Sequence, residues 1–248
     1  MRTEKPPASD LPKGGTRQLR RWHKARILDL LRKEPGLSRS DLARHLELSP
    51  SAVTEVVAEL LEEGLLLERP LPPQGQGRPS IALEVEGNRT LVLAWEIDVD
   101  RMAVALMSLS GEVRDRVLLP PAPEGPEVAL SRLAEATRPL LPGKRILAAA
   151  VTVPGLLEPG DGHLTLAPNL GWQDLPLGEG VRAALARLGL GNLPLVVENE
   201  ANAAAYGLYV LGRWEVDHCL CLNLGVGVGG GVGLVLHHQG KIPQAQPR

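Results

Sequence analysis

A polar run of carboxylates and amides, Glu198 to Asn202, follows a short apolar segment and opens an alanine-rich stretch. The apolar segment Leu193 to Val197 predicts a buried strand, and the stretch from Asn199 to Leu211 predicts a helix. Polar side chains at such a junction lie at the end of a strand, where α/β folds bind ligands. The Asn199 amide and the Glu200 carboxylate suit hydrogen bonds with ligand hydroxyl groups. In the plainer interpretation Asn199 only caps the helix.

Two features near the C-terminus have residue types that could bind phosphate or metal. The run from Gly225 to Gly231 is rich in glycine, which lets backbone N–H groups approach a phosphate or makes a tight connection between two strands. Cys219 and Cys221 are the two cysteines of the chain and are spaced as neighbours on one face of a strand. This spacing favours two buried strand thiols over a zinc pair. We predict no metal site and no cofactor.

Positive charge is concentrated near the N-terminus. Between Arg17 and Arg44 the sequence has nine Lys or Arg and three Asp or Glu, whereas the whole chain has a formal net charge of -2. Residues 1–15 contain Pro, Gly and Lys without apolar periodicity, which predicts a flexible tail. A regional basic balance indicates a nucleic-acid-binding head on a neutral body.

The segment from Leu37 to Val57 predicts two helices joined by a sharp turn. Ser38 with Asp41 has capping-box spacing, and Ser49 before Pro50 predicts a second helix start. Two strands, 65–69 and 81–85, are expected next, around a polar loop that contains Arg78. The pattern predicts a winged helix-turn-helix over residues 16–88. The expected DNA contacts are Ser38, Arg39, Arg44, Ser49, Ser51, Thr54 and, in the minor groove, Arg78.

A second domain is expected over residues 89–248. We predict adjoining strands over 91–99 and 101–107, a turn at 110–112 and a third strand after it. A helix near 126–140 and a buried strand over 146–153 come next. A long loop through Trp172 and a helix near 177–188 follow. Paired strands over 219–224 and 231–236 complete the domain. Alternating strands and helices indicate an α/β fold.

These residues in this order resemble the ROK family of repressors, open reading frames and kinases. The resemblance runs from about Arg17 to Gly240. It is carried by several spaced motifs: Gly77-Arg78-Pro79, Val153-Pro154-Gly155, Ala167-Pro168-Asn169-Leu170-Gly171-Trp172, Glu198-Asn199-Glu200-Ala201-Asn202 and Gly225 to Gly231. The resemblance implies a winged helix-turn-helix followed by an actin-like, ribonuclease H-like sugar-kinase domain. It implies a sugar site that includes Asn169, Asn199 and Glu200.

The chain departs from the family's kinases most clearly at the first phosphate loop and at the catalytic base. Where the kinases have D-x-G-G-T-K, this chain has carboxylates at Glu96, Asp98 and Asp100, which would repel a phosphate. Gly225, Gly227 and Gly229 keep part of the second loop. Glu200 replaces the kinase Asp and is one methylene longer, enough to displace a base by roughly one ångström and lose ~10²-fold in rate. We therefore predict no enzyme activity.

The resemblance is strongest to the xylose-repressor branch of the family. It implies a cytoplasmic, homodimeric repressor of carbohydrate genes, which binds double-stranded operator DNA and is released by xylose or another aldose. Family members continue into a second lobe beyond Gly240, so the C-terminal lobe is expected to be incomplete here. Two alternatives stay open: an ATP-dependent sugar kinase, and a DNA-binding remnant that no longer senses a ligand.

Overall fold

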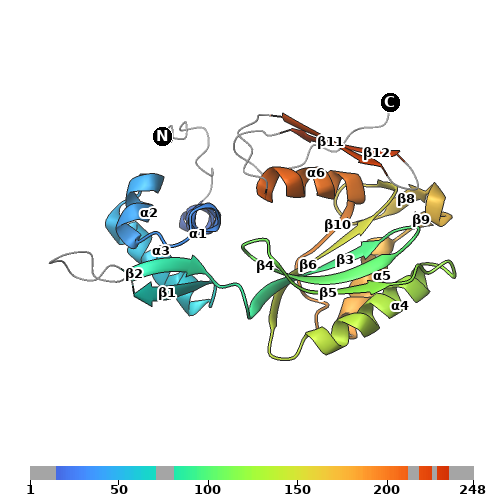
Figure 1. The fold of residues 1–248 in the computed structure, drawn as a ribbon, viewed down its shortest axis with the longest axis horizontal. Coiled ribbons are helices and arrows are strands. Elements are labelled where there is room, and N and C mark those ends of the chain that lie inside the picture. Colours follow the sequence, from blue (N-terminus) through green and yellow to red (C-terminus); the bar gives the residue numbers. More distant parts are fainter. Residues whose placement is uncertain (1–14, 71–80, 212–217, 225–227, 235–248) are drawn as a thin grey trace. The chain divides into compact units, whose positions relative to one another are not determined.

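The computed structural model describes residues 15–70, 81–211, 218–224 and 228–234 of the 248-residue chain (Figure 1). Two compact units divide between Thr90 and Leu91. The first contains the basic segment of the sequence, and the second contains the polar run at Glu198. Among the helices that the structure describes, none is long and apolar enough to cross a membrane.

The first unit is a three-helix cluster with a two-stranded sheet. Helices α1 (Thr16–Lys33), α2 (Arg39–Leu46) and α3 (Pro50–Glu62) precede strands β1 (Leu66–Pro70) and β2 (Ile81–Val85). Glu47 ends α2 in the left-handed conformation, with φ of 54°, which produces the sharp turn before α3. The predicted helix-turn-helix is confirmed. Its buried core consists of Ile27, Leu31, Leu42, Leu46, Val53, Val56, Val57, Leu60, Leu66 and Leu83.

The two strands of the predicted wing pair antiparallel, with Leu66 opposite Val85 and Pro70 opposite Ile81. Strand β2 also meets the segment before α2, because Gly36 N–H donates to Leu83 O and Leu83 N–H donates to Leu37 O. The wing strands are therefore fixed to the helical core. The predicted minor-groove residue Arg78 lies outside the described residues.

The segment between the wing and the second unit is held by a buried carboxylate. Glu86 is 7% exposed, and its carboxylate accepts hydrogen bonds from the backbone N–H groups of Asn88, Arg89 and Thr90 at 2.7–3.0 Å. The Thr90 hydroxyl donates to Gly64 O at 3.1 Å, just beyond the end of α3. These bonds tie residues 86–90 to the first unit.

The second unit is built on a five-stranded sheet. Its strands, in spatial order, are β10 (Leu195–Asn199), β6 (Arg145–Val153), β3 (Thr90–Ile97), β4 (Met102–Ser108) and β5 (Val113–Leu119). The β3–β4–β5 meander is antiparallel, whereas β10 pairs parallel to β6. Helices α4 (Pro126–Thr137), with the 3-10 turn η2 (Arg138–Leu140), and α5 (Leu177–Ala186) cover one face. Helix α6 (Glu200–Leu211) lies on the other (Figure 1).

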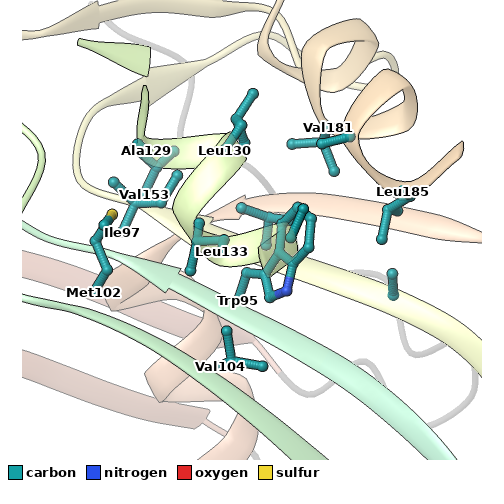
Figure 2. Packing of buried hydrophobic residues seen from close by; sticks show 14 of the residues in the cluster. Trp95, Ile97, Met102, Val104, Ala129, Leu130, Leu133, Val153, Val181 and Leu185 are labelled. Atoms are coloured by element: carbon teal, nitrogen blue, oxygen red, sulfur yellow. The ribbon is translucent and has the colours of Figure 1, made fainter. Parts of the chain in front are cut away.

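The core of the second unit lies between the sheet and the helices α4 and α5. Trp95 of β3 is 1% exposed, and Figure 2 shows its ring among Leu133 of α4 and Val181 of α5. The indole N–H donates to the Thr137 hydroxyl at 2.9 Å, which in turn donates to Leu133 O at 2.7 Å. The chain has no Phe, so aliphatic side chains around this tryptophan make the core.

The structure corrects two expectations about the second unit. Residues 154–176, expected as a long loop, contain a three-stranded antiparallel sheet of β7 (Leu156–Leu157), β8 (Leu164–Ala167) and β9 (Trp172–Leu175), with the 3-10 turn η3 (Pro168–Leu170). These strands are two to four residues long, too short for a period-two pattern to be recognised.

The second correction concerns the glycine-rich run. Strands β11 (His218–Leu224) and β12 (Val228–Leu234) pair antiparallel, with Gly229 opposite Asn223. Gly229 therefore lies in a strand rather than in a loop, although glycine inside a strand weakens it and is more typical of a turn. Gly225 and Gly227 lie outside the described residues. Cys219 and Cys221 lie in β11, as expected for strand residues.

Candidate functional site

The start of α3 is a capped and exposed helix N-terminus. The Ser49 hydroxyl accepts a hydrogen bond from Ala52 N–H at 3.2 Å, and Pro50 occupies the first helical position. Ser49, Ser51 and Thr54 are exposed. The Thr54 hydroxyl donates to Pro50 O at 2.8 Å. Exposed N–H groups and hydroxyls at a helix N-terminus are suited to contact phosphates or base edges of DNA.

The start of α2 differs, because its cap is buried. Ser38 is 8% exposed; its hydroxyl accepts from Asp41 N–H, and the Asp41 carboxylate accepts from Ser38 N–H. These two bonds form the predicted capping box. The buried Ser38 hydroxyl serves the helix, so its part in binding DNA would be to position α2.

Two arginines that were expected to contact DNA form ion pairs. Arg39 pairs with Glu68 of β1 at 2.7 Å, which joins α2 to the wing strand. Arg44 pairs with Asp41 at 2.6 Å, and 72% of its side chain is exposed. An exposed pair of this kind is weak, so a phosphate could compete for Arg44.

Part of the N-terminal positive charge is neutralised within the unit. Arg20 of α1 pairs with Glu55 and Glu59 of α3 at 3.3 and 2.6 Å. Lys24 pairs with Glu59 and Glu63 at 2.7 Å. The count of basic residues in the sequence therefore overstates the charge available to DNA, because acidic residues of the later helix α3 fold against α1.

In the second unit, Asn199 is the centre of a hydrogen-bonded cluster. Its Oδ1 accepts from Ala201 N–H at 2.8 Å and Asn202 N–H at 3.2 Å. Its Nδ2 donates to Gly155 O at 3.0 Å and to Glu200 Oε2 at 2.9 Å. The side-chain amide thus makes all four hydrogen bonds it can make. Asn199 caps α6 and positions Glu200, so a sugar hydroxyl would have to displace one of these bonds to bind it.

Two polar residues that the sequence analysis did not propose as ligands complete the cluster. Glu198 Oε1 accepts from Asn199 N–H at 2.8 Å and from Asn202 Nδ2 at 3.1 Å. Glu198 and Asn202 begin and end the motif Glu198-Asn199-Glu200-Ala201-Asn202. Their spacing of four residues across a strand-to-helix junction could have predicted this contact. Their hydrogen bond ties the first turn of α6 to the end of β10.

Glu200 is half-buried and lies within electrostatic range of a second carboxylate, Asp98. Burial of the Glu200 carboxyl raises its pKa, and the negative charge of Asp98 raises it further. The structure therefore brings the turn after β3 to the start of α6, although 102 positions of sequence separate the two residues. Protonation of Glu200 lets this group donate a hydrogen bond as well as accept one.

The turn between β3 and β4 carries its own counter-charge. Arg101 pairs with Glu96 at 3.0 Å and with Asp100 at 3.9 Å, and the hydrogen bond with Glu96 raises the pKa of Arg101. The Asp98 carboxylate accepts a bond from Val99 N–H at 2.7 Å. The three carboxylates expected to repel phosphate are thus partly neutralised by one arginine of the same turn.

Asn169 lies in the exposed turn η3, and the Gly155 turn packs against the strand that precedes it. Gly155 has φ of 140°, and a Cβ at this position would lie 2.5 Å from Leu166 O. Glycine is required by this close approach and by the backbone conformation. Gly155 thereby links the strand leading to Asn169 with the Asn199 amide. Among the described residues, Asn169 itself makes no hydrogen bond with this cluster.

Comparisons with known proteins agree with the two units. A winged helix-turn-helix DNA-binding model matches residues 24–66, and the ROK family model matches residues 92–239. A Caldicellulosiruptor sp. (strain Rt8B.4) protein, provisionally named a xylose repressor, is 31% identical over 82% of this chain and 51% of its own length. The chain spans about half the length of the curated relatives it matches.

Two solved structures show the same fold. A ROK family transcriptional regulator, described as a homologue of the E. coli MLC protein, superposes with a TM-score of 0.68 at 24% identity. The match covers 88% of this chain and 55% of that one. A ROK family glucokinase from Streptomyces griseus, in complex with glucose and AMPPNP, gives a TM-score of 0.54 at 27% identity, covering 63% and 47%. Because the family model matches more than half of its residues, this chain belongs to the ROK family.

Proposed function

We propose that this chain is a sugar-responsive transcriptional regulator, and specifically a repressor that binds operator DNA as a homodimer. The observation that carries the proposal is the capped, exposed N-terminus of α3 in the same chain as the Asn199–Glu200 cluster. The relative provisionally named a xylose repressor supports it. A cytoplasmic location follows from this function, because operator DNA is there.

In this proposal α3 enters the major groove of the operator. Ser49, Ser51 and Thr54 lie at its exposed first turns and would contact bases or phosphates. Arg39 and Arg44 would contact the backbone, with Ser38 holding α2 in position. Arg78 is proposed for the minor groove because arginine is the residue type favoured in a narrow minor groove.

The sugar would bind beside Glu200, with Asn169 approaching from the η3 turn. Glu200 is the ligand-facing group, because Asn199 uses its amide to hold Glu200 and the Gly155 turn. A half-buried site built to exchange hydrogen bonds discriminates strongly against analogues that lack the hydroxyl. We propose xylose or a related aldose as the ligand, because the Caldicellulosiruptor relative is provisionally named a xylose repressor.

We propose sensing rather than phosphoryl transfer. The turn at Glu96, Asp98 and Asp100 lacks the glycines with which backbone N–H groups approach a phosphate. Glu200 is longer than the kinase Asp and is pinned by Asn199. Sugar would release DNA by its differential affinity for two conformations, since a ligand with equal affinity for both shifts nothing.

The test is fluorescence anisotropy of the purified chain on its own upstream DNA, at two salt concentrations, with and without xylose or glucose. We expect salt-sensitive specific binding that one sugar weakens. If specific DNA binding did not change with any aldose, the chain would bind its operator without sensing a sugar. Absence of any preferred DNA would overturn the proposal. A parallel assay of ADP formation from ATP with the same sugars should give none, and turnover would identify a kinase instead.

A further inference from the structure

The solvent-exposed face of α3 has an unusual chemistry for a DNA reader. Four exposed residues of α3 lie on one side of the helix: Ser51, Thr54, Glu55 and Ala58. Their spacings of three, one and three residues place them there. We call these four residues the reading face. It contains no arginine or lysine, which read guanine bidentately, and no asparagine or glutamine, which read adenine bidentately.

The hydroxyls of the reading face are already partly used. Thr54 donates its hydroxyl hydrogen to Pro50 O at 2.8 Å, and Ser51 shares a hydrogen bond of 3.1 Å with the capping hydroxyl of Ser49. Ala58 offers only a methyl group. The strongest hydrogen-bonding group on this face is therefore the Glu55 carboxylate, whose side chain is 67% exposed.

Glu55 is held by an arginine from another helix. Arg20 Nη2 lies 3.3 Å from Glu55 Oε2, while Arg20 Nε lies 2.6 Å from Glu59 Oε1, one turn further along α3. Because Arg20 is anchored at Glu59, it restricts the rotamers of Glu55. Within the part of the chain that the structure describes, Glu55 Oε1 has no hydrogen-bond donor, so it stays available to a donor outside the protein.

We propose that Glu55 reads a cytosine of the operator through the exocyclic amino group, with Arg20 as its positioning residue. This inference rests on the proposed DNA-binding function. In the major groove cytosine presents only the N4 amino donor, whereas guanine presents two acceptors and thymine an acceptor and a methyl group. Adenine adds the acceptor N7 beside its donor. A carboxylate brought against these acceptors is repelled, so Glu55 selects cytosine partly by penalising the other bases.

The test is selection of binding sites from a random double-stranded library by the whole chain, followed by anisotropy with single-base variants of the selected site. The wild-type motif should contain one cytosine per half-site whose replacement weakens binding roughly 10-fold. The Glu55→Ala variant should bind sites with any of the four bases at this cytosine position about equally. Glu55→Gln should prefer adenine, because glutamine pairs with adenine N6 and N7.

Matched variants separate base reading from charge and from folding. Glu62→Gln removes one negative charge two turns further along α3, and its selected motif should equal that of the wild type. Arg20→Met should lower the preference for cytosine at that one position, and Arg20→Lys should restore part of it. A merely structural role of Arg20 would change affinity for every site alike and leave the base preference unchanged.

The outcomes distinguish this inference from the function on which it rests. Specific binding with the same motif in wild type and Glu55→Gln would overturn the role of Glu55 and leave the DNA-binding function standing. A motif without cytosine at the position that responds to Glu55 would do the same. Failure of the wild type to select any motif would overturn the proposed function, and the reading of cytosine with it.

Discussion

The side-chain amide of Asn199 donates a hydrogen bond of 3.0 Å to the backbone carbonyl of Gly155. This bond connects the end of β10 to the turn after β6, two parallel strands whose register places Asn199 opposite Val153. The same amide caps α6 and holds Glu200. One side chain therefore fixes three of the segments around the candidate sugar site.

Replacing Asn199 should destabilise the second unit and weaken ligand binding together. Asn199→Ala removes the cap of α6 and leaves Gly155 O without its donor, which should cost about 1–3 kcal/mol. For a unit of this size the loss corresponds to a decrease of roughly 2–4 °C in Tm per kcal/mol. Thermal unfolding monitored by circular dichroism measures it. The exposed Asn169→Ala is the control and should change Tm little; equal effects would contradict the role assigned to Asn199.

Gly155 offers a second test with a matched partner. Gly155→Ala places a methyl group 2.5 Å from Leu166 O at φ of 140°, whereas Gly160 has φ of 111° and open space around a Cβ. Both alanine variants bear backbone strain, and only Gly155→Ala adds the clash. We expect Gly155→Ala to lower the urea midpoint more than Gly160→Ala. If the two midpoints fall equally, the close approach of β8 is not what requires glycine.

The local elements of the first unit were predictable because their signals are local. Ser38, Ser49 and Pro50 mark helix starts within a few residues of the bonds they make, so the sequence indicates the caps directly. The pairing of Arg20 with Glu59 spans two helices. Each residue alone has the pattern of a solvated surface charge, so the sequence did not show that part of the basic region is neutralised.

The candidate sugar site was predictable in its motif and not in its geometry. The run at Glu198 to Asn202 identified the end of β10, but which groups are already hydrogen-bonded depends on the turn at Gly155, far away in sequence. The proximity of Asp98 to Glu200 likewise follows only from the sheet order. The short strands β7, β8 and β9 were missed because two to four residues carry no readable period.

Because of Glu86, the stability of the first unit should decrease in acid. Burial opposes its ionisation, but the backbone N–H groups of Thr90, Asn88 and Arg89 outweigh burial and lower the pKa of Glu86 below its ordinary value. A glutamate in the unfolded chain titrates near ~4.3. The contribution is therefore fully present above that pH and is lost as pH falls through the lower pKa of the folded state.

Glu86→Gln is expected to destabilise the first unit by about 2 kcal/mol near neutral pH, because its carboxamide replaces a charged acceptor and buries an unpaired donor. The difference from wild type should shrink in acid. Urea unfolding at several pH values measures it. Glu84→Gln is the control, since Glu84 forms an ion pair with Arg69, whose side chain is 66% exposed. If the free energy of unfolding of Glu86→Gln differed from that of the wild type by the same amount at every pH, the role of the Glu86 carboxylate would be contradicted.

Arg44 should contribute to the salt dependence of DNA binding, whereas Lys24 should not. Removing one cationic side chain from a DNA phosphate reduces the slope of log affinity against log salt by about 0.9. Arg44→Gln is expected to reduce the slope by that amount, because its exposed side chain can exchange Asp41 for a phosphate. Lys24→Gln removes the same charge from a residue committed to Glu59 and Glu63. A slope for Arg44→Gln equal to that of the wild type would remove Arg44 from the residues that bind DNA.

Glu200 should oppose folding when it is ionised, because its carboxyl group is half-buried near another negative charge. Burial and then Asp98 raise the pKa of Glu200 in the folded state above its value in the unfolded chain. Below the unfolded value both states are protonated and the group contributes nothing to pH dependence. As pH rises, the unfolded state loses its proton first, so stability declines until the folded state has also ionised.

Glu200→Gln, which keeps an acceptor for Asn199, should therefore raise Tm relative to wild type near neutral pH and not in acid. The same variant should bind the sugar more weakly in isothermal titration. Its one oxygen accepts from Asn199, so only the NH2 donor remains where the carboxylate has a second oxygen to accept from a sugar hydroxyl. A Glu200→Gln variant that is less stable than wild type near neutral pH would show that the carboxylate is stabilised by the fold, and would overturn this account of a strained, ligand-facing group.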